Sequence, residues 1–291
     1  MFNAIIPKLC RLRKEGKLSI LLLAISFLAI VAIAFAAPLL FPIDLAKVSL
    51  GDRLANPRFV DSDSPYLLGT DSLGRDILIR IIYATRTSLA ISMTGMFFSL
   101  VLGVFLGAVA GMFGGIADIV VMFLIECRQA IPMMLIGIVL ASTIGPGSFS
   151  IILTIIISCW SGIARITRGQ VIQLRQSKYI ESSRLFGASN IDIIFKHVLK
   201  NIASVVIVEG TLSLAGCILL ESSLSFLGLG IQPPLTSLGI MVNNGRDYLI
   251  SQWWLAIMPS LVIVLLSLQV SLIGDWLRDR MDPKLRHASG R

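Results

Sequence analysis

The sequence predicts an all-α polytopic membrane protein with six transmembrane helices. The first reason is the composition: 55% of the 291 residues are hydrophobic, 14% are charged, and the mean hydropathy is +0.86. The second is a series of apolar runs of about 20 residues, the length at which an α-helix crosses a bilayer. The third is that these runs lack the strict alternation of polar and apolar residues that a membrane-spanning β-strand requires.

The first predicted span is set apart from the others. A stretch rich in Pro and Asp, residues 42–70, follows it and is expected to be an extracytoplasmic loop with little regular structure. We expect residues 1–87 to hold a cytoplasmic segment, the first span and this loop, and residues 88–291 to form a core of five spans. The six spans are predicted at approximately Leu18–Phe41, Ser88–Met112, Ile116–Ala141, Phe149–Ile172, Ile202–Leu224 and Trp253–Gly274.

The net charge of +8 is concentrated before the first span, between residues 165 and 200, and after the last span. Cytoplasmic ends of membrane helices carry an excess of Lys and Arg, so all three places, and both termini, are expected in the cytoplasm. The 42–87 segment mixes arginines with aspartates, and we place it outside because the flanking segments require it. We interpret the basic bias as membrane topology and not as nucleic-acid binding.

The N-terminus has two interpretations. A basic start, an apolar stretch and the small residues Ala34 and Ala36 resemble a cleaved signal peptide. The apolar run, however, continues to Phe41 and is long enough to cross a bilayer. This length favours an uncleaved anchor.

A polar interruption between the fourth and fifth spans is the most informative part of the chain. A helix is expected to end at Gly187, because glycine adopts the left-handed closing conformation without steric cost. A new helix is expected to begin after Ser189, whose hydroxyl can cap the first turn together with Asp192. The result would be a rigid charged corner that could transmit force to a soluble partner. Its charged side chains are Glu181, Arg184 and Lys196.

Two patterns along the spans concern packing. Gly103, Gly107 and Gly111 recur at every fourth residue, which places them on one helix face and allows a second backbone to approach closely. They predict a packing seam inside the bundle or at a subunit interface. Trp253 and Trp254 are placed where an outer aromatic belt would lie, and we interpret them as membrane anchors.

Signatures of catalysis are missing from the sequence. It has no Walker A motif, no HExxH and no GxSxG, and its two histidines are placed at predicted cytoplasmic edges. The cysteines lack the spacing of a zinc site and imply no disulfide framework; they are Cys10, Cys127, Cys159 and Cys217. A membrane-embedded enzyme would need a nucleophile or metal ligands that the sequence does not provide.

An ion-gradient-driven secondary transporter is the alternative from a different class. Carboxylates within membrane spans can bind coupling ions, and three are available: Glu126, Glu209 and Glu221. Many such transporters are built from inverted repeats, and none is apparent here.

The motifs carry a family resemblance over residues 66–286. The segment 181–201 resembles the cytoplasmic loop of ABC importer permeases, usually written EAA followed by glycine, with Glu181 and Gly187 as the matching residues. Further blocks resemble the oligopeptide, dipeptide and nickel subfamily, and in particular its C-type chain. These blocks are residues 68–76, 223–230, 232–234 and 245–248.

The resemblance implies a type I ABC importer permease fold and a transport subunit that is not an enzyme. Its partners would be a second permease in a heterodimer, two cytoplasmic ABC ATPases and an extracytoplasmic substrate-binding protein. The chain would lie in the bacterial cytoplasmic membrane, in contact with lipid and without nucleic acid. It would bind no cofactor of its own, since ATP is used by the partner subunits.

The resemblance also implies site residues. The coupling loop is expected at about residues 175–201, a range that we call the corner segment. The ATPase-coupling residues would be Glu181, Ser182, Ser183, Gly187 and Ala188, with no catalytic or metal-binding residue. Two departures stand out: Ser182 and Ser183 replace the family's alanines, and Lys200 replaces its proline.

The expected translocation path involves Glu126, Arg128 and Glu209. Ionised groups deep in a span are costly and tend to face a cavity or a partner. One turn from Arg128 lie Leu124 and Pro132, so its partner must come from another helix. We expect Arg128 to line the path, paired with Glu209. The alternative is a purely structural ion pair between helices or with the second permease.

Relatives in this subfamily carry oligopeptides, dipeptides, nickel or metal–chelator complexes. Peptides are the expected cargo because they are the commonest. The alternative is the same machinery importing nickel or a metal–chelator complex.

Overall fold

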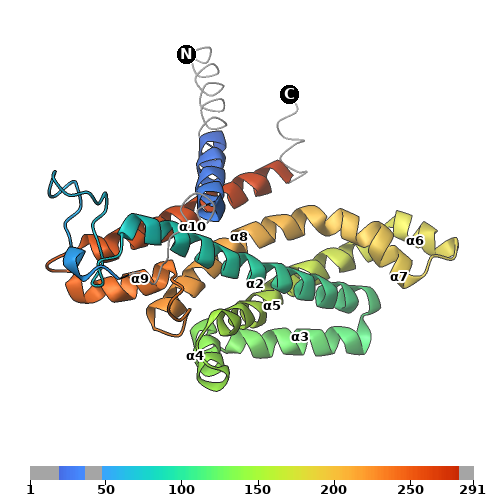
Figure 1. Cartoon of the computed structure of the whole chain (residues 1–291). Helices are drawn as coiled ribbons and strands as arrows, with labels where there is room; N and C mark the ends of the chain where they lie inside the picture. The colour runs from blue at the N-terminus through green and yellow to red at the C-terminus, as the bar shows by residue number, and fades with distance from the viewer. Residues whose placement is uncertain (1–19, 37–47, 282–291) are drawn as a thin grey trace, which may run out of the picture.

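The computed structural model describes residues 20–36 and 48–281 (Figure 1). Outside helices, the described residues contain one isolated bridge, between Thr70 and Asp76. The helices are α1 (Ile20–Ala36), η2 (Leu50–Asp52), α2 (Ile77–Phe113), α3 (Gly115–Ala130), α4 (Met133–Ile144), α5 (Ser148–Arg175), α6 (Lys178–Leu185), α7 (Asn190–Ile193), a π-helical turn η3 (Ile194–Val198), α8 (Leu199–Phe226), α9 (Leu238–Gly245), η4 (Arg246–Tyr248) and α10 (Trp254–Met281).

Four long helices form the body of the molecule. Figure 1 shows α2, α5, α8 and α10 running along the same direction, with α3 alongside. Each has at least 28 residues, or about 42 Å at 1.5 Å per residue, which exceeds the hydrocarbon core of a bilayer. Within the described residues these four could cross a membrane, and a fifth span is possible if α3 and α4 count as one. The all-α polytopic fold is confirmed, and four to five spans in the described residues are compatible with the six predicted.

The second helix begins earlier than predicted. The sequence predicted Ser88 as its first residue, whereas α2 starts at Ile77. The cause is Asp76, whose carboxylate accepts hydrogen bonds from the backbone N–H groups of Leu78 and Ile79. The loop before this helix therefore ends about three turns sooner than expected.

The prediction of the third span as a single straight helix was wrong. The predicted range Ile116–Ala141 is divided into α3 and α4, which meet at 87°. Pro132 lacks an N–H and disfavours helical geometry at the residue before it. Ile131 accordingly adopts an extended conformation, and the helix breaks there.

A glycine seam holds α2 against α5, as predicted for the interior of the bundle. A Cβ atom added at Gly103 would lie 2.7 Å from the carbonyl oxygen of Trp160, and one at Gly107 would lie 2.5 Å from that of Ala164. Backbone oxygens cannot move away as a side chain can. The close approach of the two helices therefore requires glycine at these positions.

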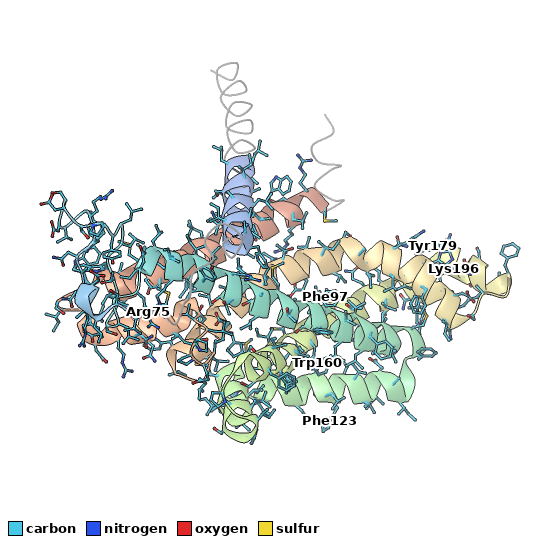
Figure 2. All side chains as sticks on the ribbon, in the orientation of Figure 1. Arg75, Phe97, Phe123, Trp160, Tyr179 and Lys196 are labelled. Atoms are coloured by element: carbon cyan, nitrogen blue, oxygen red, sulfur yellow. The ribbon has the colours of Figure 1, made fainter. Side chains whose placement is uncertain are left out.

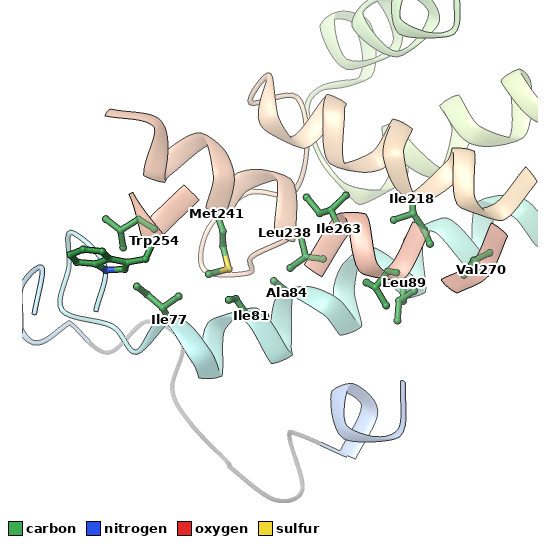
Figure 3. Close-up of a cluster of buried hydrophobic side chains, with 12 residues drawn as sticks. Ile77, Ile81, Ala84, Leu89, Ile218, Leu238, Met241, Trp254, Ile263 and Val270 are labelled. Carbon is green, nitrogen blue, oxygen red and sulfur yellow. The ribbon is translucent and has the colours of Figure 1, made fainter. Parts of the chain in front are cut away.

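A cluster of buried apolar side chains joins α2, α8, α9 and α10 (Figure 3). Trp254 belongs to it and is 4% exposed, so its prediction as a membrane anchor was wrong. Its neighbour Trp253 is 41% exposed and remains compatible with that role. Trp254 is buried because it begins α10 beneath the 48–76 segment, where its ring meets Phe59 edge-on.

The described part of the first predicted span is α1. Figure 1 shows that it crosses the direction of the long helices. It contacts the same apolar cluster through Phe27, Ile30 and Val31, and the Gln269 side chain of α10 donates a hydrogen bond of 2.8 Å to the Ser26 hydroxyl. Residues 18–19 and 37–41 of that prediction lie outside the described residues, as does Cys10.

Candidate functional site

The corner segment has the predicted geometry. Helix α6 ends before Gly187, whose φ of +84° lies in the left-handed region. The Ser189 hydroxyl accepts a hydrogen bond of 3.1 Å from the backbone N–H of Asp192 and donates one of 2.6 Å to its carboxylate. Glycine closes one helix and serine caps the next, so the direction of the chain at the corner is fixed.

No break separates the corner from the fifth span. Helix α7, the π-helical turn and α8 form one continuous helix from Asn190 to Phe226. Lys200, which stands where the resembling family has proline, donates a backbone N–H that proline would lack. Helix α7 is therefore joined to α8 by continuous helix.

The corner is anchored to the bundle by its apolar side. Ile180 of α6 and Ile193 of α7 are fully buried against Val171 and Val198. The Tyr179 hydroxyl accepts a hydrogen bond of 3.0 Å from the Asn201 side chain, and Arg175 donates one of 3.1 Å to the carbonyl of Met112. Figure 2 shows Tyr179 and Lys196 at this end and Arg75 at the other.

The opposite side of the corner is an exposed surface. Among the predicted coupling residues, Glu181, Ser182 and Gly187 are exposed, whereas Ser183 and Ala188 are half-buried. Leu185 and Phe186 project beside them with 85% and 91% of their surface exposed. Large apolar side chains left in the open beside charges are typical of a protein-binding surface. The sequence analysis missed these two, although an apolar pair inside a polar segment was a readable signal.

The predicted pair of Arg128 with Glu209 was wrong. Arg128 donates a hydrogen bond of 3.1 Å to the Ser161 hydroxyl of α5, and Glu209 accepts one of 3.3 Å from Ser213. Ser161 and Gln170 are nine residues apart, which places them on opposite sides of α5 at 3.6 residues per turn. Arg128 contacts the side of α5 that carries Ser161, whereas Glu209 lines a cavity together with Gln170 on the opposite side. Helix α5 therefore separates Arg128 from Glu209.

The other carboxylates of the spans have different surroundings. Glu126 is exposed on α3 and lines neither of the two hollows that lie beside α8. Glu221 is fully buried and accepts a hydrogen bond of 2.8 Å from the Ser225 hydroxyl. The three acidic side chains therefore do not meet at one ion site.

One face of α8 lines two hollows along its length. The first, the polar cavity, lies between α5, α8 and α10 near the corner and has a volume of about 710 Å³. The second, the apolar hollow, lies between α4, α8, α9 and α10 and has a volume of about 390 Å³. Within each hollow the residues from α8 recur at intervals of three or four, and the two sets are seven residues apart, so both lie on one helix face. They include Val205, Glu209, Leu212, Leu219, Ser223 and Phe226.

Two cysteines meet inside the bundle. The sulfur atoms of Cys159 on α5 and Cys217 on α8 are 3.5 Å apart, and both residues are free thiols. Cys127 is exposed on α3. The described residues contain no group of three or more His, Cys, Asp or Glu side chains that could hold a metal ion.

The arrangement is similar to known transporters in fold. The MetNI methionine ABC transporter, solved in inward-facing conformations, matches with a TM-score of 0.57 and 17% identity, over 71% of this chain and 98% of that one. The fold is thus that of a type I ABC importer permease. The model of the family described as binding-protein-dependent transport system inner membrane component matches residues 103–287, and the chain belongs to this family.

Curated relatives agree over most of the chain. The dipeptide transport system permease DppC of Bacillus subtilis is 38% identical over 94% of this chain and 84% of its own length. The di/tripeptide permease DppC of Pseudomonas aeruginosa is 37% identical, over 90% and 87%. The glutathione transport permease GsiD of Pectobacterium atrosepticum is 38% identical, over 89% and 85%. This chain is therefore a permease subunit of an ABC importer and not an enzyme.

Proposed function

We propose that this chain is the C-type permease of a peptide importer. The observation that carries the cargo class is the similarity to permeases named for dipeptides, di/tripeptides and glutathione, which extends over nine-tenths of the chain. No described feature favours nickel or a metal–chelator complex over peptides.

The corner segment would couple transport to ATP. The sequence has no Walker A motif. Two cytoplasmic ATPases would therefore supply the nucleotide sites and bind the surface around Glu181, Leu185 and Phe186. Their closure on ATP would displace α6 and α7, and the unbroken helix to Phe226 would carry this displacement along α8. Gly187 would keep the corner at its fixed angle.

The hollows beside α8 would form this chain's half of the path. A second permease would face α8 and α10 and close the other side. The 48–76 segment and α9 would face outward, where a binding protein delivers cargo, and both termini would be cytoplasmic. In this scheme the added first part ends before Ile77, eleven residues earlier than the predicted division at 87/88, because the core of five spans begins with α2.

Reconstitution tests the proposal. The chain is co-expressed with its second permease, its ATPases and its binding protein, purified as one complex and placed in liposomes. We expect uptake of radiolabelled dialanine that requires hydrolysable ATP and the binding protein. The control is the same vesicle with a non-hydrolysable ATP analogue. Uptake driven by an ion gradient without ATP, or a chain that purifies without any ATPase, would contradict the proposal.

A further inference from the structure

The polar cavity lies at the corner end of the bundle, and part of its lining is exposed there, namely Gln173, Asn201 and Arg278. Its walls carry one acidic and one basic side chain, Glu209 of α8 and Arg278 of α10, among uncharged polar groups. The uncharged polar residues are Gln170, Gln173, Asn201 and Ser204. A volume of about 710 Å³ lies within the range of about 300 to 1,000 Å³ that is usual for small-molecule sites.

Glu209 and Arg278 lie at the same level of the bundle. A Cβ atom added at Gly274 of α10 would be 2.7 Å from the Leu212 side chain of α8, so the two helices touch there. From this contact, Glu209 lies three residues toward the corner and Arg278 lies four. These offsets correspond to about 4.5 and 6 Å along the two antiparallel helices.

The two charges do not neutralise each other. Among the described residues, no ion pair within 4.0 Å joins Glu209 to Arg278 or to another cation. Glu209 accepts a single weak hydrogen bond from Ser213, and its other oxygen remains available for a ligand. Glu209 lies half-buried within a membrane span, where an ionisable side chain without a close ionic partner is costly and commonly marks a substrate pathway.

We infer that the polar cavity holds the charged ends of a zwitterionic cargo, with Glu209 receiving its ammonium group and Arg278 its carboxylate. This inference rests on the proposed function, and it states which groups of the cargo the cavity recognises. A guanidinium binds a carboxylate through two parallel hydrogen bonds, and a carboxylate accepts strong hydrogen bonds from an ammonium.

The uncharged lining suits the rest of a peptide. Side-chain amides donate and accept hydrogen bonds, so Gln170 and Gln173 can pair with a peptide bond whatever side chains flank it. The Asn201 amide donates to the Tyr179 hydroxyl and the His197 carbonyl, so only its oxygen is available to a ligand. Recognition would therefore be by the ends and the backbone. The same lining offers no imidazole and no thiol, the ligands that would favour a transition metal such as nickel.

The test measures peptide binding to the whole transporter. The assembled complex is purified without nucleotide and without binding protein, so that the membrane site alone is probed. Affinities are compared for dialanine, N-acetyl-dialanine and dialanine amide. In the wild type, each block is expected to weaken binding about tenfold or more, because it removes a charge-assisted hydrogen bond.

Two variants assign the charges. Glu209→Gln should weaken the binding of dialanine about tenfold and leave the binding of N-acetyl-dialanine unchanged. Arg278→Gln should also weaken the binding of dialanine about tenfold, but it should leave the binding of dialanine amide unchanged. The matched controls are Asp275→Asn and Arg280→Gln, which are exposed on α10 outside the cavity and should change nothing. The wild-type comparison of free and blocked peptides keeps the test decisive if a variant fails to assemble.

Several results would overturn the inference. They are equal wild-type affinities for free and blocked peptides, no measurable binding of dialanine, or equal losses of affinity for free and blocked peptides in either variant. If the wild type still imports peptides with ATP in liposomes, only this inference fails. If it does not, the proposed function fails as well.

Discussion

Gly187 is the residue at which backbone geometry most limits the corner. Its φ of +84° is strained for any residue with a Cβ atom, by about 1 to 2 kcal/mol. No atom lies within 4 Å of an added Cβ, so a substitution there meets strain and no clash. The strain would change the angle between α6 and α7 while leaving the bundle packed.

A valine at this position tests the coupling role. Gly187→Val is expected to leave the complex assembled and to lower the number of peptides imported per ATP hydrolysed at least several-fold. Both rates are measured in the same proteoliposomes. Gly169→Val is the matched control, because Gly169 lies in α5 with open space around it and no positive φ. A normal number of peptides imported per ATP in Gly187→Val would show that the angle of the corner is not needed for coupling.

At the scale of elements, the contact between α2 and α5 decides whether the bundle forms. An added Cβ at Gly107 would meet the Ala164 carbonyl and the Thr167 side chain, both within 2.7 Å. Overpacking a filled interior costs typically about 1 to 3 kcal/mol, and a backbone neighbour gives way less readily than a side chain. The seam is therefore a structural requirement, distinct from the transport path.

Gly107→Val is expected to reduce the yield of assembled complex strongly, as measured by size-exclusion chromatography after solubilisation. Gly162→Val on α5 serves as the control, since no atom lies within 4 Å of its added Cβ. If the two variants assemble equally well, the packing of α2 on α5 differs from that described.

Some elements could be predicted from the sequence because their cause is local. Apolar runs identify the long helices, and Gly187 and Ser189 define the corner through backbone conformation and capping. The break at Ile131–Pro132 was missed because a hydropathy window averages over it. The partner of Arg128 was missed for another reason: the face that α3 turns toward α5 depends on tertiary packing.

At the scale of the whole molecule, orientation in the membrane is the property that the positive-inside rule predicts. Ser62 is exposed in the 48–76 segment, and Gln176 is exposed between α5 and α6. In a background without native cysteines, Ser62→Cys should react with an impermeant thiol reagent in intact cells whose outer layer is permeable. Gln176→Cys should react only after lysis. The reverse pattern would invert the topology.

The central claim is that cargo passes along the face of α8 that lines the two hollows. Val205 lies on this face and lines the polar cavity, so a photoreactive amino acid there would meet the cargo. Ile207 lies on another side of the helix, outside both hollows, and is 51% exposed. The direct measurement is crosslinking of radiolabelled peptide to the chain during ATP-driven turnover. We predict labelling at position 205 that depends on ATP and binding protein, and none at 207. Equal labelling at both positions, or labelling at 207 alone, would contradict the account.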